Sequence, residues 1–84
     1  MQKKPETIFP ERPGVYFFKS GTKVLYAGKA LSLKHRLNSY FDAKVSEKTQ
    51  QLVEEANEIE FIETGSEFEA LLLEANYIKK YRPH

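Results

Sequence analysis

Two short runs of apolar and aromatic residues, 14–19 and 24–29, dominate the first third of the chain. Both runs are rich in the valine, tyrosine and phenylalanine that favour strands. Between them lies Ser20-Gly21-Thr22, a combination typical of a turn. The pattern therefore predicts an antiparallel β-hairpin.

The register of this hairpin decides where its tyrosines lie. If Lys19 pairs with Lys23, Tyr16 stands directly opposite Tyr26, with both phenols on one face of the sheet. Taken singly, strand tyrosines are most often core residues with a satisfied hydroxyl, so the pair is weak support for a site. Gly28 follows at a point where a ligand or another backbone could approach closely.

Helical periodicity begins after the hairpin. Ser32 is a candidate N-cap for a helix that reaches about residue 41. The expected core stripe of this helix consists of Leu33, Leu37, Tyr40 and Phe41. A second helix is expected over about 47–57 and a third strand over 58–64.

A long final helix is predicted after Gly65, because Ser66-Glu67-Phe68-Glu69 has the pattern of a capping box. Its expected core stripe consists of Phe68, Leu71, Leu72, Ala75 and Ile78. Pro83 ends it. The order strand, strand, helix, helix, strand, helix predicts an α+β fold, with a small three-stranded antiparallel sheet flanked by helices.

With 84 residues, the chain has room for one hydrophobic core. Residues 1–13 hold three prolines and are expected to form an irregular lead-in, with Ile8 and Phe9 against the core, while residues 14–84 form a single domain. No apolar run approaches the roughly 20 residues that span a bilayer, and none resembles a signal peptide, so a cytoplasmic location is expected. Zero cysteines and two histidines exclude disulfides and a zinc centre built from those ligands alone.

The net charge of +1 conceals an uneven distribution. Residues 1–40 hold eight Lys/Arg and two acidic residues, whereas residues 41–84 hold five and ten. A basic half fits a polyanion site, and ordinary solvated charge on helix faces explains it as well. The charge is too small for tight binding to nucleic acid, so we expect weak, salt-sensitive DNA binding.

One carboxylate, Glu74, lies beside the expected apolar stripe of the final helix, three residues after Leu71 and four before Ile78. A carboxylate in such a place needs a partner, a proton or a bound cation. A boundary glutamate that turns to solvent or pairs with a lysine is the simpler alternative, and the position alone favours it.

Basic residues after the hairpin supply candidate phosphate ligands. Arg36 and Tyr40 are one helical turn apart and share a face, while Lys29 directly follows Gly28. Arg36 could equally pair with Asp42. Hydroxyls, fixed cations and one carboxylate together are what a metal-assisted phosphodiester hydrolase needs.

Together these motifs resemble the signature of the GIY-YIG nuclease family. The matching segments are Gly14-Val15-Tyr16, Tyr26-Ala27-Gly28-Lys29, Arg36, Tyr40, and Glu74 within Ala70-Leu71-Leu72-Leu73-Glu74-Ala75-Asn76. The similarity covers residues 9–84 and is especially close to members that act in nucleotide excision repair. It is far more specific than either short tripeptide alone.

The resemblance implies cleavage of a DNA phosphodiester on the 3′ side of a lesion with one divalent metal ion, Mg²⁺ or Mn²⁺. By this analogy Tyr26 is the general base, with Tyr16 adjacent in the same pocket. Glu74 is the only protein carboxylate on the metal, which otherwise keeps waters, as magnesium commonly does. A phenol ordinarily has a pKa near about 10, so a base role needs help from nearby cations or concerted proton transfer.

The same resemblance implies that Arg36 and Lys29 stabilise the phosphate charge and that Tyr40 orients the phosphate. The implied partners are DNA and the proteins of an excision-repair damage complex, which act through regions outside this chain. The chain itself is expected to be monomeric.

Two departures from the family pattern stand out. Ala27 replaces a larger residue at the centre of the second tripeptide, and His84 stands where the pattern, after Arg82-Pro83, continues with a tyrosine and then a catalytic-site asparagine. We therefore expect these residues to be a shortened domain of a larger protein, with poor activity in isolation. A stand-alone or differently fused GIY-YIG nuclease, and a non-catalytic DNA- or protein-binding module of the same fold, remain alternatives.

Overall fold

The structure, a computed structural model, describes residues 8–42 and 44–81. Three strands, β1 (Gly14–Ser20), β2 (Lys23–Ala30) and β3 (Glu58–Glu63), form one antiparallel sheet with β1 in the centre. β1 is central because it carries the most continuously apolar run, with both of its faces covered.

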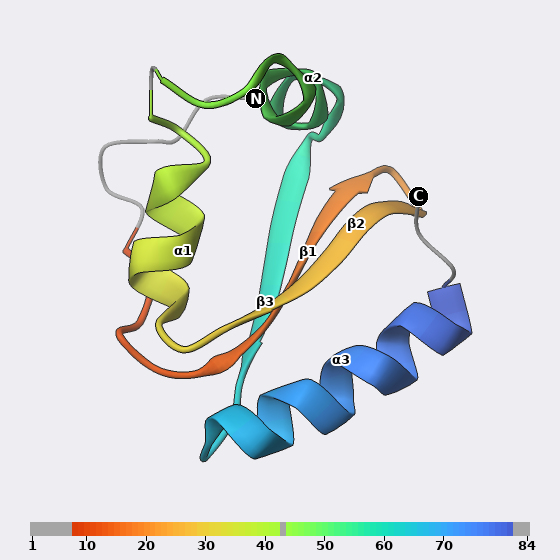
Figure 1. The fold of residues 1–84 in the computed structure, drawn as a ribbon. Coiled ribbons are helices and arrows are strands. Elements are labelled where there is room, and N and C mark those ends of the chain that lie inside the picture. The colour runs from red at the N-terminus through yellow and green to blue at the C-terminus, as the bar shows by residue number, and fades with distance from the viewer. Residues whose placement is uncertain (1–7, 43, 82–84) are drawn as a thin grey trace.

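Three helices flank the sheet, with α1 (Leu33–Ser39) and α2 (Glu47–Glu55) on one side and α3 (Glu67–Tyr81) on the other (Figure 1). This arrangement confirms the predicted α+β fold. Within the described ranges, no helix combines the length and apolar character needed to cross a membrane.

Each helix begins directly after a serine whose side chain caps it. The hydroxyls accept hydrogen bonds of 3.2–3.3 Å from the backbone N–H three residues further on, at Ser32, Ser46 and Ser66. Glu69 completes the predicted capping box in a shifted form, because its carboxylate accepts from the N–H of Gly65 at 3.1 Å. Local sequence therefore defines where these helices start.

The hairpin register differs from the prediction. Tyr16 pairs with Gly28 and Phe18 with Tyr26, so Tyr16 does not stand directly opposite Tyr26. A two-residue turn, in which Gly21 has φ 62°, closes the hairpin, and the register then shifts at a β-bulge where Leu25 is the extra residue. The predicted register is already off by one residue at the turn, where Lys19 pairs with Val24 and not with Lys23, and the bulge shifts every later pair by one more.

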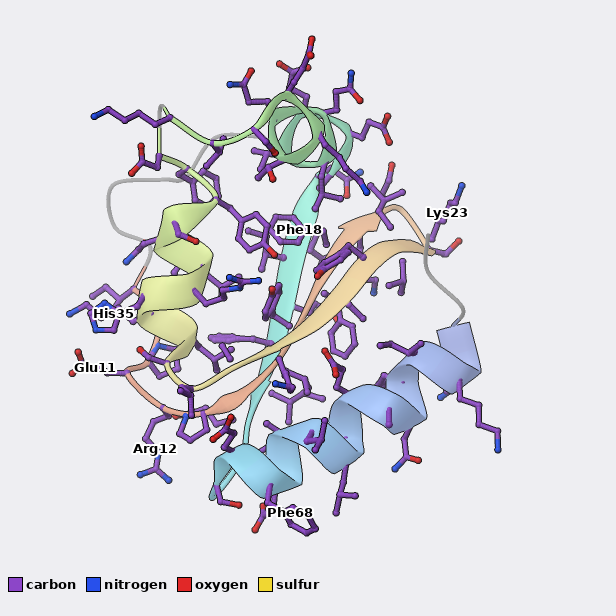
Figure 2. All side chains as sticks on the ribbon, in the orientation of Figure 1. Glu11, Arg12, Phe18, Lys23, His35 and Phe68 are labelled. Carbon is purple, nitrogen blue, oxygen red and sulfur yellow. The ribbon has the colours of Figure 1, made fainter. Side chains whose placement is uncertain are left out.

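The larger apolar core lies between the sheet and α1 and α2. Tyr16, Phe18, Leu33 and Leu37 are fully buried there, and Phe18 points into this space in Figure 2. The lead-in adds Phe9, as predicted. Ile8 was predicted to join it, but is 85% exposed.

The lead-in is fixed to the start of α1 by backbone hydrogen bonds. The N–H of Leu33 donates to the carbonyl of Arg12 and the N–H of Lys34 to that of Pro10, both at 2.9 Å. These two N–H groups belong to the first turn of the helix, which has no intrahelical acceptors for them. An exposed pair between Glu11 and His35, 3.0 Å apart, adds a side-chain contact (Figure 2).

The second core lies between the sheet and α3 and is smaller. Its buried members are Val15, Phe17, Val24, Ala27 and Ala70, and Leu73 and Tyr77 pack against them. The helix therefore faces the sheet with Ala70, Leu73 and Tyr77, which also follow helical spacing.

The predicted core stripe of α3 was wrong. Phe68, Leu71, Leu72 and Ile78 are 41–67% exposed, Ala75 is exposed as well, and Phe68 points away from the sheet in Figure 2. The helix is apolar around much of its circumference, so spacing alone fits two faces. The small side chain of Ala70 lets the backbone of α3 approach the sheet, which favours the observed face.

Gly14, at the start of β1, lies where three elements meet. A Cβ there would be 2.8 Å from Cδ1 of Leu33 and closer still to the carbonyl oxygen of Ile62. Since real Cβ atoms do not approach other atoms so closely, a side chain at this position would separate β1 from β3 and α1.

Candidate active site

A network of three polar side chains lies on the sheet face covered by α1. The Tyr16 and Tyr40 hydroxyls share a hydrogen bond of 2.7 Å, and Nε of Arg36 donates to the Tyr16 hydroxyl at 3.2 Å. β1 positions Tyr16, whereas Arg36 comes from α1 and Tyr40 caps the end of that helix. The predicted sharing of a face by Arg36 and Tyr40 is what allows both to reach one hydroxyl.

Aromatic packing holds these groups in place. The Tyr40 ring lies 4.7 Å from Phe18 and 5.7 Å from Tyr16, measured between ring centroids, and the guanidinium carbon of Arg36 is 5.8 Å from the centre of the Tyr40 ring. An arginine near an aromatic face gains cation–π attraction as well as hydrogen bonding. The cation is therefore oriented by ring contacts and one hydroxyl, and no carboxylate of residues 8–42 or 44–81 pairs with it.

Tyr26 lies beside this network and is half-buried. Its ring centroid is 6.2 Å from that of Tyr16, so the two tyrosines share one sheet face despite the shifted register. Tyr26 also lines a surface cavity, whereas Tyr16 is fully buried. Of the two, Tyr26 is the one whose side chain borders open space.

Burial controls the ionisation of the other two phenols. It raises the pKa of Tyr16 above its ordinary value, although the hydrogen bonds with Tyr40 and Arg36 act in the opposite direction. Burial, followed by the hydrogen bond with Tyr16, also raises the pKa of Tyr40. The hydrogen bond with Tyr16 raises the pKa of Arg36. At neutral pH the network therefore consists of two neutral phenols and one cation.

Gly28 gives Tyr16 the room that it occupies. A Cβ on Gly28 would lie 2.6 Å from both Cζ and Oη of Tyr16, so any side chain there would displace the phenol. The two residues are paired in the sheet, and the phenol therefore lies directly over the glycine. The sequence predicted a close approach at Gly28 by a ligand or another backbone, whereas the group that approaches is the Tyr16 side chain.

Lys29 and Glu74 lie on the other side of β2. Lys29 pairs with Val15, whose side chain belongs to the α3 core, and paired residues share a face. Glu74 is half-buried on α3 and makes no hydrogen bond or ion pair within the described part of the chain. Because β2 is an edge strand, groups on its two sides can meet only around that edge.

The donor set around Glu74 fits a magnesium ion better than a metal that needs a full protein cage. Among the described residues, no group of three or more histidine, cysteine or acidic side chains is placed so that it could hold a metal ion. Mg²⁺ is commonly held by one or two carboxylates and completes its shell with water and phosphate oxygens. A half-buried carboxylate that has no partner among the residues the structure describes has the chemistry for that type of site.

The sequence did not predict that the site continues toward α2. A cavity of about 680 Å³ extends from Tyr26, Arg36 and Tyr40 to the helix and to the start of β2. Lys48, Leu52 and Glu55 line it, at positions four and three residues apart, so they share one helical face. The sequence shows this helical spacing, but it does not indicate against which element that face of α2 would lie.

Comparison with known proteins agrees with this architecture. The profile of the UvrC-like GIY-YIG domain matches residues 12–84. UvrABC system protein C of Desulforudis audaxviator is 53% identical over 76 residues, and that of Thermus thermophilus is 55% identical over 74. These alignments cover 89% and 88% of this chain and 12% of each relative, so the chain spans about an eighth of their length.

A solved structure is similar as well. The GIY-YIG N-terminal endonuclease domain of UvrC from Thermotoga maritima, bound to its catalytic magnesium, is 51% identical, with a TM-score of 0.84 over 89% of this chain and 83% of that one. Profile, sequence and structure therefore agree. The chain belongs to the UvrC-like GIY-YIG domain family.

Proposed function

We propose that this chain is a metal-dependent endonuclease domain that hydrolyses a DNA phosphodiester. The observation that carries the proposal is the partly buried network in which Arg36 is fixed to Tyr16 beside the accessible Tyr26. The similar domain from Thermotoga maritima is an endonuclease with a catalytic divalent cation, magnesium. The sequence identity of 51% over 89% of this chain supports the same reaction here.

Each polar side chain then has a role in the hydrolysis. Tyr26 takes the proton of the attacking water, because it borders open space, and Tyr16 holds Arg36 in position. Arg36 and Lys29 offset the negative charge that builds up on the phosphate, and Tyr40 orients a phosphate oxygen through its hydroxyl. The pKa of Tyr16 is raised by burial, which makes it a poor base and a good hydrogen-bonding support.

Glu74 is the residue of this chain that would hold the divalent ion, Mg²⁺ or Mn²⁺. When bound, such an ion polarises the phosphate and lowers the pKa of a bound water. The chain contributes a single carboxylate and leaves the remaining positions to water and substrate.

The physiological reaction that fits is the 3′ incision of nucleotide excision repair. The relatives are components of a UvrABC system, and this chain corresponds to only 12–13% of their length. DNA is therefore the substrate, and a UvrB-type damage complex is the partner, engaged through regions outside these residues. We place the reaction in the bacterial cytoplasm, and the chain acts as a monomer within that complex.

Two substitutions test the catalytic assignment. Tyr26→Phe keeps the ring and removes the hydroxyl, and Glu74→Ala removes the carboxylate without emptying a core position. Each is expected to lower the incision rate by at least about a hundredfold and to leave the melting temperature nearly unchanged. Single tyrosine-to-phenylalanine variants of the Thermotoga domain bind its catalytic cation, which supports the expectation that the fold tolerates such a change.

The assay uses damaged duplex DNA, Mg²⁺ and the repair partners, with a chain extended through the asparagine of the family pattern. Matched controls are Tyr77→Phe, which removes a hydroxyl on α3, and Glu54→Ala, which removes an exposed carboxylate on α2. Both should cleave at the rate of the unsubstituted chain. Normal cleavage by Tyr26→Phe and Glu74→Ala would refute the assignment and favour a non-catalytic module of this fold.

A further inference from the structure

The cavity beside the tyrosines is larger than one phosphate requires. Its volume of about 680 Å³ lies within the range of roughly 300–1,000 Å³ that is typical of small-molecule sites. It is bounded by β2, by the end of α1 and by one face of α2. Of the residues that line this cavity, the catalytic roles proposed above use only Tyr26, Arg36 and Tyr40.

The β-bulge supplies an apolar wall to this cavity. Lys19 pairs with Val24 and Phe18 with Tyr26, so Leu25 has no paired residue on β1. Leu25 and Tyr26 are consecutive, and yet both pack toward the same core and line the same cavity. A regular strand would send two neighbours to opposite faces, so the bulge redirects one extra apolar side chain toward the site.

Polar groups complete the wall from the other side. α2 presents Lys48, Gln51, Leu52 and Glu55, and β2 adds Lys23 beside the hairpin turn, where Figure 2 places it at the edge of the fold. The lining thus combines two aromatic and three aliphatic side chains with cations and hydrogen-bonding groups. The cations outnumber the single carboxylate, so an anionic ligand is favoured over a cationic one.

We propose that this cavity receives one unstacked nucleotide of the cleaved DNA strand, adjacent to the phosphate at Arg36; the inference deepens the proposed function and rests on it. The face of a base packs against Tyr26 and Leu25. Lys23 and Lys48 meet the flanking phosphates. Gln51 and Glu55 can bond to the edge of the base, which a stacked and paired base does not expose in this way.

Binding can be measured on the 84-residue chain without metal, so that it does not depend on cleavage. The probe is the dinucleotide TpT, titrated against the ¹⁵N-labelled chain, with inorganic phosphate as the comparison. TpT is expected to give saturable amide shifts at Leu25, Thr49 and Leu52 and none at Ala70 in the other core. Phosphate at equal concentration should leave Leu25 and Leu52 unshifted.

A pair of charge reversals gives the matched control. Lys48→Glu, at the cavity, should weaken TpT binding about fivefold or more, whereas Lys79→Glu, on α3, should change it less than about twofold. Both lysines are exposed, so both variants should fold.

Shifts centred elsewhere, equal shifts with phosphate, or equal weakening by both charge reversals would each overturn the inference. If the proposed function is wrong but this inference is right, the result is different. In that case the Tyr26→Phe variant would cleave DNA normally, while TpT would still bind in the cavity.

Discussion

The two faces of the central sheet are built in different ways. The face toward α1 and α2 buries large side chains completely and encloses the hydrogen-bond network of Tyr16. The face toward α3 is covered by one helix, of whose described side chains only Ala70 is fully buried, while Leu73 and Tyr77 are half-buried and the larger residues Phe68, Leu71, Leu72 and Ile78 are exposed. The difference indicates that the first face provides the rigidity and the second carries Glu74 on a less extensively packed support.

The largest effect should follow from damage to the first face. Leu37→Ala removes a fully buried side chain from α1 and should lower the free energy of unfolding by about 3 kcal/mol. Urea denaturation measures this directly. A loss under about 1 kcal/mol would mean that this face is not the stability-determining core.

Gly28→Ala tests how closely the site depends on that packing. The added methyl group would meet the phenol of Tyr16, so we expect a loss of about 1–3 kcal/mol and displacement of Tyr16 from Arg36. Gly65→Ala is the matched control, because a Cβ there meets only the flexible carboxylate of Glu69 at 3.2 Å. Equal losses at the two glycines would contradict the close contact, and denaturant titration of both variants separates the outcomes.

Alkaline pH should weaken the first face selectively. The pKa values of Tyr16 and Tyr40 are raised in the folded chain, so the fold favours their protonated forms. Their contribution is complete below the unfolded-state pKa of about 10 and is lost as the pH rises through the folded-state values.

The free energy of unfolding should therefore fall more steeply above pH 10 in the unsubstituted chain than in Tyr40→Phe. Urea titrations between about pH 8 and 11 measure both slopes, and comparing the two proteins cancels the contribution of lysine titration. Parallel slopes would show that Tyr40 ionises as freely in the folded chain as in the unfolded one.

The smallest effect should come from the outer surface of α3. Leu72 is 52% exposed, so Leu72→Gln should change the free energy of unfolding by no more than about 0.5 kcal/mol. It should also reduce self-association at high concentration, which light scattering detects, because it interrupts an exposed apolar surface. A loss above about 2 kcal/mol would mean that α3 packs against the sheet through the stripe that the sequence predicted.

Features that depend only on neighbouring residues were predicted correctly from the sequence. The serine caps at Ser32 and Ser66, the hairpin turn and the order of elements all follow from neighbouring residues. The rotation of α3 could not be predicted in this way, because Ala70 and Leu71 both begin apolar repeats and only contact with the sheet decides between them. The bulge at Leu25 was equally inaccessible, since it depends on how two strands align beyond the turn.

In the candidate site, too, local features were predictable and packing was not. The shared helical face of Arg36 and Tyr40 was predictable from their spacing, and the family resemblance marked the tyrosines as candidate site residues. The fully buried position of Tyr16, which makes it a support for Arg36, depends on packing between β1, α1 and Gly28. The roles of Lys29 and Glu74 stay predictions, because no described contact joins either residue to the tyrosines.

Gly14 and Gly28 have a consequence for how distant relatives of this chain should be interpreted. Each is required by the close approach of another group: the carbonyl of Ile62 at Gly14 and the phenol of Tyr16 at Gly28. A descendant could keep both glycines, replace Arg36 and Glu74, and still fold, which is how a pseudoenzyme would arise from this scaffold. The glycines of the signature are therefore evidence of common ancestry, whereas the proposed catalysis depends on the hydroxyls, the guanidinium and the carboxylate.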